Sequence, residues 1–271
     1  MTLLIGIIIG AVLGLTGAGG SVLAVPLLAV FLKLPAAEAT GISLGVVAAS
    51  SAWGAIDRII HKQVLWIPAA LFGISGMVFA PIGRWLTVLV DPLTLKIAFI
   101  ALSLLIAARM LWQSFRQPEQ ARLVRGDTGN DEAETDPLLC RLSETRRFDW
   151  RPRCMVGLFA GGVLTGLLSG FFGVGGGFLI VPFLTQLNSV SMRQAIATSL
   201  VIIAGVSSSG FAMQLLTQQM NLSLLLWLAA GGVAGMIAGS LLAKHIAGVV
   251  LQRLFALTII AMTLLLLTTR G

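Results

Sequence analysis

The chain has 271 residues, of which 57% are hydrophobic and only 11% charged, and its mean hydropathy is +0.96. A soluble domain of this composition would expose far more apolar surface than folded domains tolerate, so the composition excludes an ordinary soluble protein. The formal net charge of +7 does not indicate a nucleic-acid partner, because most basic residues lie in one polar segment or at the ends of apolar stretches.

The first apolar stretch, residues 2–32, is cut by a glycine cluster into two pieces, each near 20 Å long as a helix. It is either one broken, tilted transmembrane helix or a re-entrant hairpin that turns near the middle of the membrane and leaves on its entry side. Six uninterrupted apolar stretches of about 20 residues are each long enough to cross a hydrocarbon core as a helix. They cover residues 39–56, 64–83, 93–112, 195–217, 222–243 and 249–268.

The chain repeats itself at a constant offset. Gly14–Pro26 returns 156 positions later as Gly170–Pro182, and the register holds without a gap, with Ser43 matching Ser199 and Gly76 matching Gly232. Two glycine-interrupted segments at corresponding places in two halves indicate a transporter's binding site. The sequence predicts an all-α integral membrane protein of two tandem homologous repeats, each with a glycine-broken first helix and three transmembrane helices. The predicted repeats cover residues 1–113 and 152–271, and a polar, cytoplasmic linker covers 114–151.

The distribution of basic residues indicates whether the two repeats are parallel or inverted in the membrane. If the first segment of each half spans the membrane, the repeats are parallel; if it is re-entrant, they are inverted. The inverted arrangement puts 14 of the 18 basic residues on the linker side, and five against four once the linker and Arg109 are set aside. The positive-inside rule therefore favours inverted repeats, with both termini outside, although the parallel arrangement stays open.

The glycine clusters are the first candidate binding elements. A helix that starts afresh after a break presents unpaired backbone N–H groups and a partial positive charge, which together can bind an anion. Glycines spaced by four residues, at 6, 10 and 14 and again at 162, 166 and 170, fit close helix packing instead. The clustered ones predict a substrate site at Gly17, Gly19, Gly20, Ser21, Gly173, Gly175, Gly176 and Gly177, and we expect the two breaks to meet near the middle of the membrane.

Hydroxyl groups extend this candidate site. Ser43 and Ser199 occupy corresponding positions, and a hydroxyl can donate to an oxyanion without placing a fixed charge in the bilayer. The alternative is that these hydroxyls bond back to their own helix or serve as small packing residues. We predict that both contribute to substrate binding.

Few charged residues fall within the predicted spans. Asp57 and His61 are candidates for proton coupling or gating, and the alternative is an interfacial group at a helix end. The glycine loops lack the Lys-Ser/Thr of a nucleotide-binding loop, and no metal-binding or catalytic arrangement is present in the sequence, so we expect no cofactor, no metal and no enzymatic activity.

The doubled motif, together with Lys62–Trp66 and Leu251–Leu257, resembles the TauE/SafE family over essentially the whole chain except the linker. The resemblance implies a secondary transporter of the bacterial inner membrane that exports sulfur-containing anions such as sulfite or sulfonates. The chain departs from the family in its long charged linker, and in Thr16-Gly17-Ala18 where a Ser-Gly-aliphatic step is usual.

Two rival functions fit the same sequence. An anion channel would use the same helix dipoles along a continuous polar path, whereas a carrier shows saturable counterflow. A membrane scaffold that acts through a partner bound to the linker would lose its function when residues 119–149 are deleted. The oligomeric state does not follow from the sequence.

Overall fold

The computed structural model describes residues 1–17, 20–116, 152–173, 175–177, 180, 181, 184, 192–217, 221–242 and 260. Most of the expected linker, 117–151, and the apolar stretch 249–268 except Ile260 lie outside these residues. The elements described are helices: α1 (Thr2–Thr16), α2 (Gly20–Phe31), α3 (Ala36–Ile60), α4 (Trp66–Leu89), α5 (Pro92–Arg116), α7 (Pro152–Phe172), α9 (Met192–Thr217) and α10 (Leu222–Leu242).

Five of these helices, α3, α4, α7, α9 and α10, are long and apolar enough to cross a membrane. Large apolar side chains such as Ile74, Leu105 and Trp227 are exposed on the outside of the bundle. Hydroxyl side chains such as Ser43 and Ser199 are fully buried. This distribution suits a bundle surrounded by lipid, because lipid accepts apolar side chains that water would reject. The predicted all-helical membrane fold is confirmed at this level.

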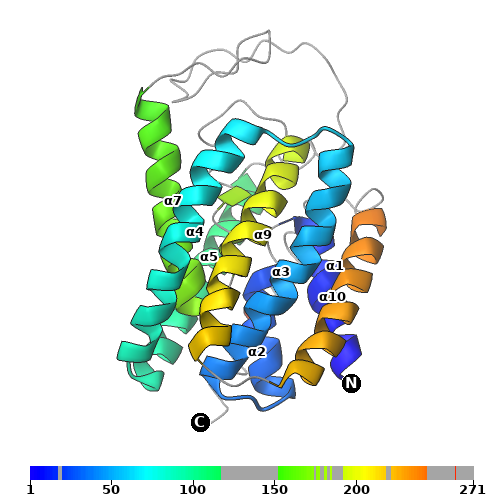
Figure 1. Cartoon of the computed structure of the whole chain (residues 1–271), viewed down its shortest axis with the longest axis vertical. Helices are drawn as coiled ribbons and strands as arrows, with labels where there is room; N and C mark the ends of the chain where they lie inside the picture. Colours follow the sequence, from blue (N-terminus) through cyan, green and yellow to red (C-terminus); the bar gives the residue numbers. More distant parts are fainter. Residues whose placement is uncertain are drawn as a thin grey trace.

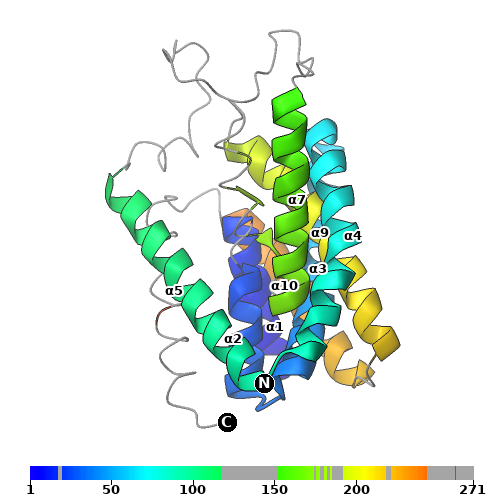
Figure 2. The same ribbon diagram turned by 90° about the vertical axis from the view of Figure 1, so that its left-hand side faces the viewer.

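Six helices form a row in which neighbours in space come from opposite halves of the chain. The row runs α1, α10, α3, α9, α4, α7; Figure 1 shows α10 at the right with α1 behind it, and α7 at the left. The pair α3 and α9 lies at its centre, and α2 packs against α1 and α3. Figure 2 shows α5 inclined to this row, where Phe99 of α5 places its ring 6.0 Å from that of Phe172 at the end of α7.

The helix directions follow from which residues face each other. Helices α1, α3 and α10 run in one direction, and α4, α7 and α9 run in the opposite direction. In the first group, α1 is parallel to α10 by the contacts Gly6–Leu228 and Gly14–Met236, and α3 is parallel to α10 by Val46–Gly232 and Gly54–Met236. In the second group, α4 is parallel to α9 by Gly73–Ile202 and Ala80–Gly210, and to α7 by Phe72–Gly162 and Ala80–Gly170. The two groups are antiparallel, because α3 contacts α9 at Gly41–Gln214 and at Gly54–Leu200.

Glycine makes the outer helix pairs possible. A Cβ added to Gly10 would collide with the backbone of Gly232, and one added to Gly166 would collide with the backbone of Gly76. The two pairs correspond under the repeat, because Gly10 matches Gly166 and Gly76 matches Gly232 at the offset of 156 residues. Small residues allow helix backbones to approach closely in a membrane, where the hydrophobic effect does not drive helices together. The prediction that the glycines spaced by four serve packing is confirmed.

The first apolar stretch forms a helical hairpin. Gly17 ends α1 in the left-handed conformation, with φ 69° and ψ −6°, and α2 returns toward the end of the bundle where α1 began (Figure 1). The turn lies deeper than expected, since Gly14 packs beside Met236 and Ser240, close to the end of α10 at Leu242. The hairpin therefore turns near the end of α10 rather than near its middle, because α1 packs along nearly all of α10.

Candidate functional site

The two glycine breaks have the same local geometry. Gly17 follows α1 with φ 69° and donates its N–H to the Leu13 carbonyl at 2.7 Å. Gly173 follows α7 with φ 68° and donates its N–H to the Ser169 carbonyl at 2.8 Å. Glycine reaches this left-handed conformation without the steric cost that other residues carry, and the resulting cap satisfies one carbonyl at the helix end. Each break is therefore a specified turn rather than a frayed helix end.

Each break is held by a serine of the other half. The Ser43 hydroxyl of α3 donates to the Gly173 carbonyl at 2.6 Å, and the Ser199 hydroxyl of α9 donates to the Gly17 carbonyl at 3.1 Å. Each hydroxyl also lies within 2.8 Å of a carbonyl in its own helix, at Thr40 and Ile196. A hydroxyl has a single hydrogen, so in this structure both serines use it on backbone carbonyls. Both serines that we predict to bind substrate therefore lie against the breaks, and their hydroxyls face carbonyl oxygens.

The two breaks lie at opposite ends of the central helix pair, although the sequence led us to expect them to meet. Gly17 packs on Ile196 near the start of α9, and Gly173 packs on Thr40 near the start of α3. Because α3 and α9 are antiparallel, these starts are at different ends. Gly41 and Gly54, which contact α9 near those ends, are 13 residues apart on α3, about 20 Å at the helical rise of about 1.5 Å per residue. The repeat shows which residues correspond, and corresponding residues need not be neighbours.

The remaining glycine candidates are described unevenly. Gly19 lies outside the described residues, and Gly20 begins α2, followed by Ser21. Gly175 and Gly176 both have φ 67°, and Gly177 is buried. A Cβ on Gly176 would meet Thr165, and Ser169 lies just behind it at 3.3 Å. The second break therefore folds back onto the last turns of α7.

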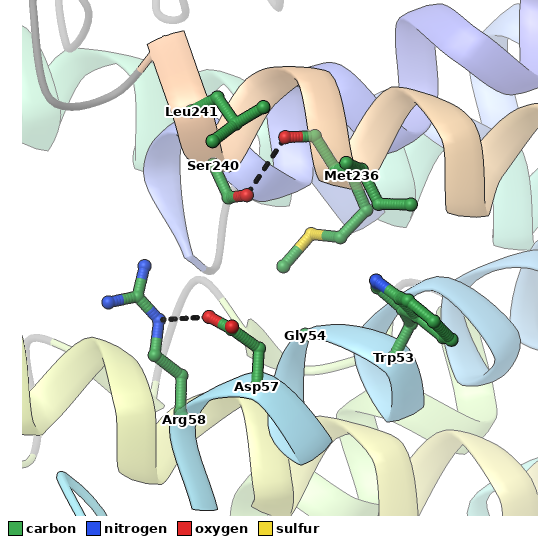
Figure 3. Close-up of a pocket in the computed structure, with 8 residues that line it drawn as sticks. Trp53, Gly54, Asp57, Arg58, Met236, Ser240 and Leu241 are labelled. Atoms are coloured by element: carbon green, nitrogen blue, oxygen red, sulfur yellow. Dashed lines mark hydrogen bonds and ion pairs between the residues drawn. The ribbon is translucent and has the colours of Figure 1, made fainter. Parts of the chain in front are cut away.

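The candidate coupling residues lie at the end of α3. The Asp57 carboxylate is 3.9 Å from Arg58 Nε and 3.6 Å from His61 Nδ1, and the Asp57 and His61 side chains are 54% and 61% exposed. A cavity of about 260 Å³ opens beside them between α3 and α10. Figure 3 shows Asp57 and Arg58 facing Met236, Ser240 and Leu241 across it. Exposed ion pairs contribute only about 0–1 kcal/mol, so fold stability alone gives little reason for this cluster.

Arg84 was missed by the sequence reasoning. The apolar stretch was predicted to end at residue 83, which put Arg84 outside the membrane, but α4 continues to Leu89 and Arg84 is only 2% exposed. Its backbone N lies against Gly170 of α7, three residues before the second break. The signal was available, because Gly83 and Arg84 match Gly239 and Ser240, which lie inside another apolar stretch.

A bundle of membrane-crossing helices that buries hydroxyls, capped glycine turns and an arginine is typical of multi-pass membrane transporters. The chain belongs to the TauE/SafE sulfite exporter family, whose sequence model matches residues 2–266. The resemblance found in the doubled glycine motif is thereby confirmed.

Individual relatives agree with this class. Two proteins of Xylella fastidiosa named "Probable membrane transporter protein" match the chain: 29% identity in strain Temecula1 and 30% in strain 9a5c, each over 95% of this chain and 90% of the relative. A Methanocaldococcus jannaschii protein, also named a probable membrane transporter, is 27% identical over 78% of this chain and 70% of its own length. No solved structure matches the chain significantly. The protein is a multi-pass membrane transporter.

Proposed function

We propose that this transporter exports small sulfur-containing anions, such as sulfite or sulfonates, across the bacterial inner membrane by alternating access and without catalysing a reaction. The family description supports the substrate class and the direction of transport. The capped breaks support a carrier, because irregular backbone at membrane depth is tolerated only where it is buried in protein or lines a wet cavity.

The reciprocal hydrogen bonds from Ser43 to Gly173 and from Ser199 to Gly17 carry this proposal. We propose that residues 1–113 and 152–271 are inverted copies, a plan shared by many secondary transporters. The opposite directions of α1 and α7, and of α4 and α10, support that arrangement. Each copy then places one break toward one side of the membrane, and each break is fastened to the central helix of the other copy.

This packing also suggests which bodies move. Since α1 packs on α10 and α7 packs on α4, the rigid outer pairs each combine a helix of one repeat with a helix of the other. We propose that these two pairs, rather than the two repeats, rock about the central α3 and α9. A break that parts from its serine on one side opens a path there, while the opposite break stays closed.

Counterflow in proteoliposomes tests the proposed function. Vesicles loaded with unlabelled sulfite are expected to take up labelled sulfite faster than empty vesicles, with saturation, and with inhibition by external sulfonates. Protein-free vesicles give the leak. Linear, non-saturating flux without acceleration identifies a channel. An absence of flux for sulfite, sulfonates, sulfate and chloride contradicts anion transport and leaves the scaffold function to be tested by deleting residues 119–149.

Asp57 provides a separate test of proton coupling. If it carries the coupling proton, Asp57→Asn is expected to lose the stimulation of net transport by a pH gradient and to keep counterflow within about twofold, because exchange needs no net proton movement. The measurement is labelled sulfite flux with and without an imposed gradient, and Asp91→Asn, which changes an exposed carboxylate between α4 and α5, is the control. Stimulation that survives Asp57→Asn assigns Asp57 to an interfacial ion-pair cluster.

A further inference from the structure

A small cluster of buried apolar side chains lies beside the first break. Its four members come from α1, α3, α9 and α10: Leu13, Ala55, Leu200 and Met236. Ile196, whose side chain packs on Gly17, lies against the same cluster. The space that these four helices enclose beside Gly17 is therefore filled by apolar side chains.

Met236 lies between this cluster and the cavity at the end of α3. It is only 2% exposed, and its terminal methyl group fills the hollow of Gly54, where an added Cβ would collide with it. The same residue lines the cavity of about 260 Å³ between α3 and α10, opposite Asp57 and Arg58 (Figure 3). Met236 therefore borders the cavity on one side and the cluster beside the first break on the other.

Methionine is suited to a movable barrier. Its side chain is unbranched and has three rotatable bonds, so it can change conformation while its helix stays in place. Most core side chains are enclosed by close packing, but Met236 has the cavity beside it, into which it can turn. Such a rotation would vacate the space that it fills between Gly54 and Leu200, and would join the cavity to the cluster.

The second break is closed differently. The position equivalent to Met236 is Ala80, whose side chain ends at Cβ. At that end of the bundle Thr87 donates its hydroxyl to the Phe171 carbonyl at 2.9 Å, whereas the equivalent of Thr87 at the first break is Ala243, which has no hydroxyl. The second break thus has an additional bond to its backbone, and the first has a long flexible side chain beside a cavity.

We infer that the cavity between α3 and α10 is the entry site of the transported anion on its way to the first break, and that Met236 is the gate between the two. The inference rests on the proposed transport function. In the proposed inverted arrangement the ends of α3 and α10 lie on the linker side, from which an exporter takes up its substrate. The first break is then the one that opens toward the cytoplasm.

Arg58 provides hydrogen-bond donors at the mouth of this cavity. A guanidinium carries five N–H donors in a plane that suits an oxyanion, and Arg58 uses one nitrogen on the Gln63 side-chain oxygen at 3.0 Å. The Asp57 carboxylate, 3.9 Å from Arg58 Nε, offsets part of the positive charge. The mouth can therefore receive an anion without holding it tightly, as a transport path requires.

The accessibility of a buried thiol tests the gate. Leu13→Cys places the thiol in the cluster, at a position that is fully buried, after Cys140→Ser and Cys154→Ser have removed the native thiols. The probe is 2-sulfonatoethyl methanethiosulfonate, a thiol reagent that is itself a small sulfonate. It is added to the protein in lipid nanodiscs, in which both ends of the bundle face the solution.

Met236→Ala is expected to speed this labelling at least about tenfold, because a buried group reacts in proportion to the fraction of molecules that are open. Met77→Ala is the matched control, since the Met77 methyl group likewise fills the hollow of a glycine, Gly205, but on α4 and away from the cavity. It should change the rate less than about twofold. If Leu13→Cys does not fold, Ala55→Cys adds one sulfur atom to the same cluster and gives the same comparison.

Counterflow of labelled sulfite relates the gate to transport. Met236→Phe is expected to lower the initial rate at least about tenfold, because a rigid ring cannot turn aside as the methionine chain does. Met236→Leu keeps the volume and the apolar character, so its rate should stay within about threefold of the wild type.

Equal labelling rates in Met236→Ala and Met77→Ala overturn the gate, as does a Met236→Phe variant that transports as fast as Met236→Leu. In both cases saturable counterflow by the wild type leaves the proposed function standing. An absence of saturable counterflow in the wild type overturns the proposed function, and with it the entry role of the cavity, whatever the labelling rates.

Discussion

Gly17→Ala is expected to reduce sulfite counterflow at least about tenfold while the protein still reaches the membrane. Gly17 has φ 69°, and a side chain in this conformation costs about 1–2 kcal/mol. Its new Cβ would also collide with the Ile196 side chain, one turn before Ser199, whose hydroxyl holds this break. The turn must therefore shift or lose its hydrogen bond, and either change disturbs the proposed gate.

The collision involves a side chain and can be relieved. Gly17→Ala combined with Ile196→Ala is expected to recover part of the flux, because only the backbone strain remains. Gly210→Ala is the control, since its new Cβ would meet only side chains, the nearest being Leu44 at 3.3 Å. Initial counterflow rates, normalised to the amount of reconstituted protein, measure the effect. Wild-type flux in Gly17→Ala would show that this break takes no part in transport.

Gly166→Ala is expected to cause the largest loss of stability. Its Cβ would collide with the backbone of Gly76 at the centre of the α4–α7 pair, and backbone atoms of a packed helix cannot move aside as a flexible side chain can. Overpacking usually costs about 1–3 kcal/mol, and we expect the upper end of that range or more. At roughly 2–4 °C per kcal/mol, the unfolding midpoint should fall by about 10 °C.

Gly73→Ala on the same helix α4 is the matched control. Among the described residues, the only atom within 4 Å of its added Cβ is an Ile202 side-chain carbon at 3.9 Å, an ordinary contact. Alanine is favoured over glycine within a helix by about 1 kcal/mol, so this variant should be as stable as the wild type or slightly more stable. Thermal unfolding of both detergent-solubilised variants, followed by size-exclusion chromatography, makes the comparison. Equal midpoints for the two variants would contradict the close packing described for α4 and α7.

Hydropathy and the repeat predict much of this fold. The apolar stretches at 39–56, 195–217 and 222–243 correspond to α3, α9 and α10 within a few residues. Helix length and burial in lipid are local properties of the chain, so a window of residues is enough to find them. The capped turns could also be found, because the glycine clusters mark where a left-handed residue ends a helix.

The packing order and the surroundings of the breaks could not be predicted in the same way. Hydropathy does not show that α1 packs against α10, because this pairing depends on the close fit of the glycine face of α1 to the backbone of α10. The offset of 156 relates Gly17 to Gly173 but does not place one beside the other. Arg84 was misplaced because its charge ends an apolar window, although the helix continues around it.

The pairing of α1 with α10 also bears on the order in which the chain is assembled during synthesis. Thr2–Thr16 is made before the surface that accepts its glycines, on Leu222–Leu242, which follows more than 200 residues later in the chain. Until then α1 has no partner against which to seat Gly6, Gly10 and Gly14. Helix α10 therefore completes the packing of α1, and a product truncated before α10 leaves the glycine face of α1 without this partner.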